Sequence, residues 1–434
     1  MILCIKSTEI IYERLVYMAE KCRYPLVFVH GMFGWGSDEG INDKLPYWGA
    51  TTGDLMEFLN DNGYEAYSAS CGPVSSAWDR ACEVYARIMG TTVDYGKVHS
   101  KNANHRRFGR TYDEPLFEGW SSEKKIHLIG HSFGGNTVRM LAYLLTYGSK
   151  AEQDETKPDE LSPLFEGGHE DLLQSVVTIC APHNGTTTFQ AAEKFKIMNP
   201  LAFVAYNYIG IMGRTRAEGS IFDFHLEQYG LSDTPGKKDA YPMRRAKKQM
   251  MVNNDNVQYD MSPIGAKRFN HMLEISPNTY YFSYAYNAVT ESRSGKLHYP
   301  SRTDFPFLAF TASLVLVYNR FTDPQNNKSF SGYANDGLVN LNSAIHPEDE
   351  PFKDYDENDI QPGIWNVMPV RTGDHGTPIG LFADKEQTHD FYLVMLQTLA
   401  ETEELSAKRK SVPAKKPAPR KRAAKKAAPK SEEK

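Results

Sequence analysis

The chain has 434 residues, of which 41% are hydrophobic and 24% are charged, and its formal net charge is −5. This length and hydrophobic content predict a globular protein with a substantial buried core. No apolar stretch approaches the roughly 20 residues of a membrane-spanning helix, so we expect no transmembrane segment. The five cysteines form a small, odd-numbered set, which favours reduced thiols over a disulfide framework.

The two ends of the chain carry distinctive charge patterns. Glu9, Glu13 and Arg14 interrupt the N-terminal residues where a secretory signal would be uncharged, so we expect no signal peptide and a cytoplasmic location. Residues 408–434 carry twelve Lys and Arg against two Glu, and this composition predicts a disordered tail. Such a tail could bind anionic lipid or nucleic acid, or it could be only a solvated arm.

Strand and helix patterns alternate along the predicted body, residues 1–407. The strand patterns are "YPLVFV" (24–29), "EAYSAS" (65–70), "IHLIGH" (126–131) and "LQSVVTI" (173–179). The helix patterns are "GDLMEFLNDN" (53–62), "WDRACEVYARIMG" (78–90) and "GNTVRMLAYLLTYG" (135–148). This alternation predicts a single α/β domain with a mainly parallel sheet covered by helices on both faces.

Residues 188–330 break this alternation with short apolar segments, tyrosines and basic residues. A stretch without regular periodicity inside an α/β chain is typical of an insertion. We therefore predict that it forms a cap on the domain.

Residues 130–134, Gly-His-Ser-Phe-Gly, match the G-x-S-x-G pattern of a nucleophile elbow between a strand and a helix. A strand that turns directly into a helix strains the middle residue, and side chains two positions away would collide unless they are small. The turn would hold the Ser132 hydroxyl above the sheet edge, with the Phe133 N–H at the helix N-terminus directed toward an oxyanion. We predict that Ser132 is a nucleophile; the alternative is a glycine-rich helix start.

A serine nucleophile needs a histidine base and a carboxylate that orients it, and in this fold the order is Ser, Asp or Glu, then His. Asp336 in "YANDGLVNLNSA" and His375 in "RTGDHGTPIG" both lie in predicted loop tips at strand ends. Asp374 and His389 are other candidates, although Asp374 is the chain neighbour of His375 and His389 falls in a helical pattern. Spacing alone leaves open that Asp336 and His375 are ordinary loop residues.

A second oxyanion donor is expected from the loop after an early strand. "HGMFGWG" (30–36) follows the first predicted strand, and the N–H of Met32 is the best-placed donor. The alternative is an ordinary glycine turn.

Together these residues resemble the family of thermophilic bacillus and staphylococcal triacylglycerol lipases, which are α/β-hydrolases. The resemblance covers about residues 24–402 and is dense in "YWG", "LNDNGY", "SSAWDRACEVYA", "RFGRTY", "SPLFEGGHEDLLQSVVTI", "APHNGTTT" and "NDGLVN". It implies that Ser132, Asp336 and His375 form a catalytic triad, and that the amides of Met32 and Phe133 form the oxyanion hole. The family often has Phe and Gln or Met at these two positions, a difference that should alter the acyl pocket more than the chemistry.

The resemblance also implies a zinc site at Asp79, His99, His105 and Asp255. Two neutral imidazoles and two carboxylates can form a closed tetrahedral Zn²⁺ site that serves structure rather than catalysis. Such a site would pin the cap to the main sheet. The spacing of His99 and His105 by itself also fits ordinary surface histidines.

The calcium site of the family transfers poorly to this sequence. The family's carboxylate two residues after the catalytic histidine is Thr377 here, and its following Asp-Pro is replaced within "GLFADKE". Asp384 could compensate for this loss.

Residues 188–213 correspond to the lid of the family. Their apolar side chains could cover Ser132 in water and swing onto a lipid interface; they are Phe189, Phe195, Ile197, Met198, Leu201, Phe203 and Val204. An apolar lid implies that the substrates are long-chain acyl esters, because each buried CH₂ of the acyl chain contributes about 0.8 kcal/mol of binding free energy. The alternative is that the segment is a core helix of the cap.

The resemblance thus implies a serine ester hydrolase, a triacylglycerol lipase that binds lipid esters at a lipid–water interface. Carboxylesterase and phospholipase are the alternatives among enzymes, and a binding module that uses the basic tail is the alternative from another class. The resembling lipases are secreted, which conflicts with the expected absence of a signal peptide.

Overall fold

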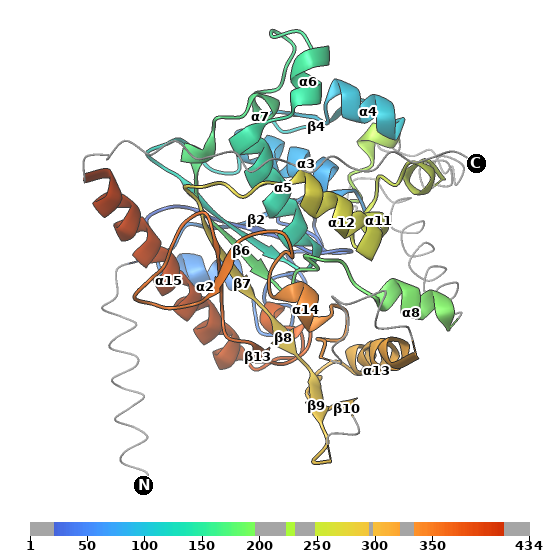
Figure 1. Ribbon diagram of the computed structural model, residues 1–434. Coiled ribbons are helices and arrows are strands. Elements are labelled where there is room, and N and C mark those ends of the chain that lie inside the picture. The colour runs from blue at the N-terminus through green and yellow to red at the C-terminus, as the bar shows by residue number, and fades with distance from the viewer. Residues whose placement is uncertain (1–20, 196–222, 231–247, 295–297, 322–333, 412–434) are drawn as a thin grey trace, which may run out of the picture.

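The centre of the molecule is a seven-stranded parallel β-sheet (Figure 1). The computed structural model describes residues 21–195, 223–230, 248–294, 298–321 and 334–411. In spatial order the strands are β11 (Phe352–Asp354), β12 (Trp365–Val367), β7 (Tyr280–Tyr284), β6 (Leu173–Ile179), β5 (Ile126–His131), β1 (Leu26–Val29) and β2 (Ala66–Ala69). All neighbouring pairs are parallel, as predicted.

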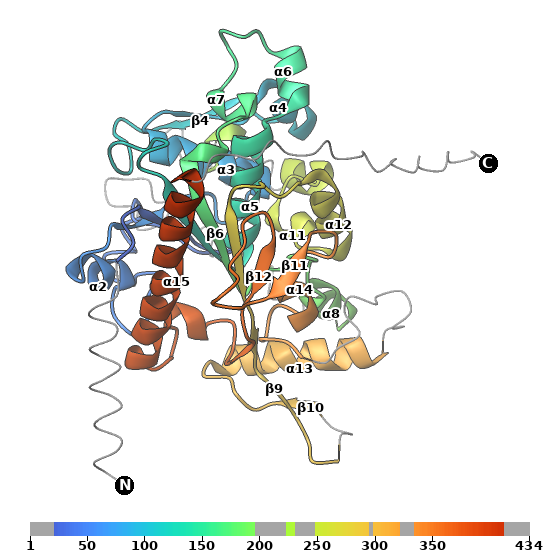
Figure 2. The same cartoon turned by 60° about the vertical axis from the view of Figure 1, so that its left-hand side comes forward.

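Helices cover both faces of this sheet because successive strand side chains point to opposite sides. In β1, Val27 belongs to one hydrophobic cluster and Phe28 to the other. The first cluster includes α3 (Ala77–Met89) and α5 (Phe133–Tyr147), and the second includes α2 (Leu55–Asp61) and α15 (Lys385–Ser411). Figure 2 shows the sheet between α5 and α15. The predicted α/β architecture, with helices on both faces, is confirmed.

Further helices and short strands surround this core. The helices are α4 (Lys97–Ala103), α6 (Lys150–Glu155), α7 (Pro163–Glu166), α8 (Thr188–Lys194), α11 (Val257–Asp260), α12 (Pro263–Met272), α13 (Pro306–Phe321) and α14 (Leu341–Ala344), with 3₁₀ turns η1 (Glu170–Leu172), η2 (Glu227–Tyr229) and η4 (Thr377–Ile379). Three two-stranded sheets pair β3 (Thr92–Asp94) with β4 (Phe108–Thr111), β8 (Tyr286–Asn287) with β13 (Arg371–Thr372), and β9 (Val289–Glu291) with β10 (His298–Pro300).

The predicted cap range, residues 188–330, requires a correction. It contains β7, which lies between β6 and β12 in the central sheet. All five β7 residues are buried, so the strand lacks the alternation of polar and apolar residues that marks a half-exposed strand. The chain therefore leaves the sheet after β6, returns at β7, and leaves it again. Most of the predicted lid, from residue 196 onward, lies outside the described residues.

The C-terminal helix α15 ends at Ser411, four residues beyond the predicted end of the body at 407. The rest of the predicted basic tail lies outside the described residues. None of the described helices combines the length and apolar character needed to cross a membrane. Cys22, Cys71, Cys82 and Cys180 are buried free thiols, as the cysteine count predicted for them.

Glu403 in α15 joins the two ends of the described chain. Its carboxylate accepts hydrogen bonds from the backbone N–H groups of Arg23 (3.0 Å) and Tyr24 (3.2 Å), and it lies 3.1 Å from His127 Nε2 in β5. Burial alone would raise the pKa of Glu403, but His127, Tyr24 and Arg23 hold it below its ordinary value. The ionised carboxylate is therefore the form that stabilises the fold.

We expect Glu403→Gln to lower the free energy of unfolding by about 1–3 kcal/mol, because buried donors lose their acceptor. Since the pKa of Glu403 is lowered in the folded state, its contribution is present at neutral pH. That contribution is lost as the pH falls below the ordinary glutamate value of about 4.3. Urea unfolding at pH 7 and pH 4 should show the gap between wild type and variant narrowing at the lower pH.

The matched control is Glu404→Gln, since Glu404 is partly exposed and pairs with Lys408 on the surface of α15. A pair of this kind contributes about 0–1 kcal/mol. Equal losses for the two variants at pH 7 would contradict the role assigned to Glu403.

Candidate active site

The chain turns at Ser132 directly from β5 into α5. Ser132 has φ 55° and ψ −128°, a conformation that costs a non-glycine residue about 1–3 kcal/mol. A Cβ atom on Gly130 would lie 2.3 Å from the Gly134 oxygen, and one on Gly134 would lie 2.1 Å from the Val29 oxygen. Both positions therefore require glycine, and the close packing of β1, β5 and α5 holds the turn in its strained form.

Asp336 and His375 lie side by side although 39 residues separate them. His375 Nδ1 is 2.7 Å from Asp336 Oδ2, and the His375 backbone N–H donates to the Asp336 carbonyl at 2.8 Å. The other carboxylate oxygen accepts from the N–H groups of Leu338 (2.9 Å) and Val339 (2.7 Å). These bonds offset the cost of burying the carboxylate. An imidazole held through Nδ1 carries its basic lone pair on Nε2.

Ser132 lies near this pair because the residue before it, His131, contacts His375. His131 Nε2 lies 2.9 Å from the backbone oxygen of His375, and the centroids of the two histidine rings are 4.8 Å apart. Within the described residues, the His375 ring bonds to Asp336 and not to Ser132 Oγ. Contacts between a nucleophile and its base are often long until substrate binds.

The other two candidates from the sequence have different partners. Asp374 accepts hydrogen bonds from the backbone N–H groups of Asp304 (2.8 Å) and Gly376 (2.9 Å). His389 in α15 stacks on Phe58, with ring centroids 3.6 Å apart. The structure therefore pairs His375 with Asp336.

The loop after β1 passes beside Ser132, since a Cβ atom on Gly31 would lie 2.7 Å from Ser132 Cβ. In this loop the Phe33 N–H donates to the Pro73 carbonyl at 3.0 Å, whereas the Met32 N–H has no backbone acceptor among the described residues. Phe133 is the first residue of α5, where an N–H has no partner within the helix. Two amides near Ser132 are thus available to an oxyanion.

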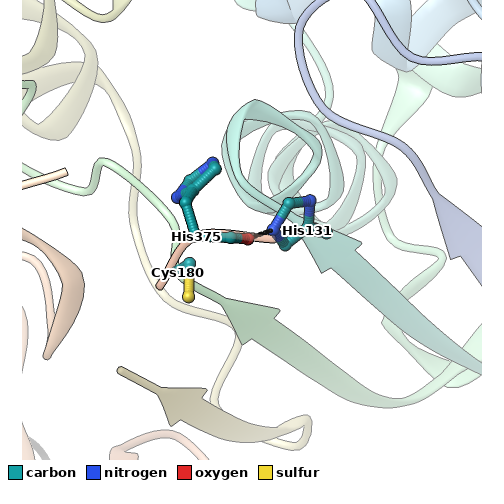
Figure 3. A group of neighbouring side chains, drawn as sticks. All are labelled: His131, Cys180 and His375. Atoms are coloured by element: carbon teal, nitrogen blue, oxygen red, sulfur yellow. Dashed lines mark hydrogen bonds between the residues drawn. The ribbon is translucent and has the colours of Figure 1, made fainter. Parts of the chain in front are cut away.

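Three buried side chains at this site had no catalytic signal in the sequence: Tyr47, His131 and Cys180. Figure 3 shows His131 bonded to the His375 carbonyl, with Cys180 close by. Burial, reinforced by the charge and hydrogen bond of Asp336, raises the pKa of the Cys180 thiol well above its usual value. A protonated thiol and a histidine with both ring nitrogens engaged are poor metal ligands, so this group does not form a metal site.

The four residues of the predicted zinc site converge in a second cluster, with one potential ligand atom from each lying within 4.8 Å of the others. His99 Nε2 is 2.9 Å from Asp79 Oδ1, and His105 Nε2 is 3.3 Å from Asp255 Oδ2. His105 Nδ1 lies 2.7 Å from the Arg106 carbonyl. A bond of this kind fixes the ring so that Nε2 faces the carboxylates. The cluster is compatible with a bound metal ion.

The electrostatics of this cluster also fit a cation. Burial alone would favour the neutral acid, but His105 and His99 hold the pKa of Asp79 well below its ordinary value. Burial would lower the pKa of His105, but Asp79 and Asp255 raise it to about 10. His105 Nε2 is buried beside both carboxylates yet has no hydrogen bond of acceptable geometry. A dication bound by neutral imidazoles would satisfy this nitrogen and neutralise the carboxylates.

The region that corresponds to the family's calcium site forms local hydrogen bonds. Thr377 Oγ1 accepts from the Asp374 N–H at 2.9 Å, and Asp384 Oδ1 accepts from the Gln387 N–H at 2.9 Å near the start of α15. These contacts do not favour a calcium site, and we propose none.

The chain is similar to known proteins over most of its length. Residues 22–410 match the family model described as "Lipase-like, C-terminal domain". The chain is 33% identical to Lipase 2 of Staphylococcus aureus over 399 residues, which cover 89% of this chain and 55% of that protein. It therefore spans about half the length of the curated relatives it matches.

Two solved structures are similar over most of the chain. Staphylococcus hyicus lipase matches with a TM-score of 0.75 and 31% identity, covering 90% of this chain and 98% of that one. EstA from Clostridium botulinum matches with a TM-score of 0.72 and 35% identity, covering 88% of each chain. These matches and the parallel sheet confirm an α/β-hydrolase-like fold. The chain belongs to the bacillus and staphylococcal lipase family that its sequence resembles.

Proposed function

We propose that this protein is a serine ester hydrolase, a triacylglycerol lipase, in which Ser132, Asp336 and His375 form the catalytic triad. The observation that carries the proposal is the strained Ser132 turn beside the buried Asp336–His375 hydrogen bond. Ordinary helix starts do not need a serine with positive φ, and strain of this kind gathers at functional sites. The names of the similar proteins, which include lipases, support the same assignment.

In the proposed mechanism, Ser132 Oγ attacks the carbonyl carbon of the ester while His375 Nε2 takes its proton. Asp336 holds the imidazole through Nδ1 and stabilises the imidazolium that forms. The amides of Met32 and Phe133 donate to the developing oxyanion. The imidazolium then gives its proton to the leaving alkoxide, and water cleaves the acyl-enzyme by the same sequence of steps.

Long-chain acyl esters of glycerol are the proposed substrate class. Burial of each acyl CH₂ contributes about 0.8 kcal/mol, so long chains add binding energy where an apolar surface covers the site. The proposed lid and lipid–water interface belong to the predicted segment 188–213, of which the structure describes α8. Phe189 in α8 packs against the main hydrophobic cluster of the body.

We expect Ser132→Ala to lower kcat at least about a thousandfold, because the variant has no nucleophile. Hydrolysis of p-nitrophenyl esters from C2 to C16, together with triolein and a phospholipid, would measure both activity and substrate class. Ser149→Ala serves as control, since Ser149 caps the ordinary helix start of α6, and it should keep wild-type activity.

Retention of ester hydrolysis by folded Ser132→Ala would contradict the assignment. Cleavage of only short esters would favour a carboxylesterase, and cleavage of only the phospholipid would favour a phospholipase.

We further propose that Asp79, His99, His105 and Asp255 bind a structural zinc ion. Two nitrogen and two oxygen ligands suit Zn²⁺, and a four-ligand site has no open position for catalysis. Gln228 donates to the Asp79 carboxylate at 3.1 Å and Tyr229 to that of Asp255 at 3.2 Å, and such outer bonds orient metal ligands. The ion would join α3 and α4 to the segment between β6 and β7.

We expect the purified protein to contain one zinc ion per chain and His105→Gln to lose it, as measured by elemental analysis. The free energy of unfolding should be about 4 kcal/mol lower for the metal-free protein than for the protein with zinc at a thousand times its Kd. His271→Gln, which changes an exposed histidine of α12, should retain both zinc and stability. A folded protein that binds no zinc even when excess zinc is supplied would refute the site.

A further inference from the structure

A buried chain of hydrogen bonds connects the loop after β1 to the loop that carries His375. The Gly31 N–H donates to the Tyr47 hydroxyl oxygen at 2.9 Å. Tyr47 Oη lies 2.7 Å from His131 Nδ1, and His131 Nε2 lies 2.9 Å from the His375 carbonyl oxygen (Figure 3). This series of hydrogen bonds therefore begins at Gly31, next to Met32, and ends at the backbone of the proposed catalytic base.

The chemistry of these groups allows one consistent direction of donation. A carbonyl oxygen only accepts, so His131 Nε2 must carry the hydrogen that it donates to His375. In a neutral imidazole Nδ1 is then an acceptor, and it takes the hydrogen of the Tyr47 hydroxyl. The oxygen of Tyr47 remains free to accept from Gly31. Burial, together with repulsion from His375, keeps the pKa of His131 well below its usual value, which agrees with a neutral ring.

Aromatic packing holds Tyr47 and His131, the two side chains in this series of hydrogen bonds, in place. The Tyr47 ring meets Trp35 and Trp48 edge to face, with centroids 5.8 Å and 5.4 Å apart. Trp48 also packs edge to face on the His131 ring, with centroids 6.1 Å apart. Trp48, Tyr47 and His131 are all buried, so these rings have little freedom to change their rotamers.

The geometry excludes a role for His131 as a second base. Both of its ring nitrogens have hydrogen-bond partners, and neither partner is Ser132. The side chain instead supports the backbone of His375, whose ring is fixed separately by Asp336. Tyr47 supports Gly31, which contacts Ser132.

We propose that Tyr47 and His131 are positioning residues, which together fix the distance between the oxyanion loop at Gly31–Met32 and the catalytic base His375. This inference rests on the proposed ester hydrolase function. Catalysis requires the oxyanion donors and the base to be positioned around the same ester group at the same time. A change in the relative position of the two loops should therefore slow the chemical step while leaving substrate binding nearly unchanged.

The first test is Tyr47→Phe, which removes the hydroxyl and leaves the ring in its packing. We expect kcat for p-nitrophenyl ester hydrolysis to fall about tenfold, with KM within about twofold. The control is Tyr281→Phe, because Tyr281 is also a buried tyrosine whose hydroxyl accepts a backbone N–H, from Ser276 at 3.1 Å. Both variants should lose similar stability, and only Tyr47→Phe should lose kcat.

The second test compares two replacements of His131 and does not depend on Tyr47→Phe folding well. Gln can place an amide N–H near the position of imidazole Nε2 and so donate to the His375 carbonyl, whereas Met of similar size has no donor. We expect His131→Gln to retain several times more kcat than His131→Met. The rate at which a phosphonate ester labels Ser132 should follow the same order.

The outcomes separate this inference from the proposed function. Equal kcat values for Tyr47→Phe and Tyr281→Phe, or for the Gln and Met variants, would overturn the positioning role while wild type still hydrolyses esters. Absence of Ser132-dependent hydrolysis in wild type would overturn the proposed function itself.

Discussion

The architecture of this site depends on one steric constraint, the contact between β1, β5 and the first turn of α5. The backbone oxygen of Val29 and the backbone of Gly134 leave no space for a side chain, so α5 can begin only directly above the sheet. Ser132 must then adopt a positive φ, and its cost of about 1–3 kcal/mol must be offset by the packing of the core. Parallel strands place the following loops at the same edge, which explains how residues from distant parts of the chain meet Ser132.

Buried polar groups around this edge are held largely by backbone donors. Asp336 and Asp374 each accept hydrogen bonds from backbone N–H groups, although only Asp336 also faces an imidazole. Backbone donors cannot rotate away as long side chains can, so each carboxylate keeps one orientation. The two aspartates differ in the partner of the second carboxylate oxygen, which in Asp336 faces the ring of His375, the proposed catalytic base.

The sequence predicted the parts of this structure that depend on local patterns. Strand and helix periodicity located β1, α2, α3, β5 and α5, and the G-x-S-x-G pattern located the Ser132 turn, because both signals arise within a few residues. Asp336 and His375 were placed in loops, but spacing could not show that they bond to each other. Tyr47 and His131 lacked a signal because their roles arise from contacts across 84 and 244 residues. The strand β7 was assigned to the cap because full burial removes the alternation of a half-exposed strand.

The position of Glu403 has a consequence for how the protein is made. Its bonds to Arg23 span 380 residues, so the first strand of the sheet cannot gain this partner until nearly the whole body has left the ribosome. Until α15 docks, the apolar face formed by β1, β5 and β6 on that side of the sheet lacks the part of its cover that α15 provides beside α2. An apolar face that is incompletely covered favours aggregation, so the docking of α15 protects the body once its residues have been made.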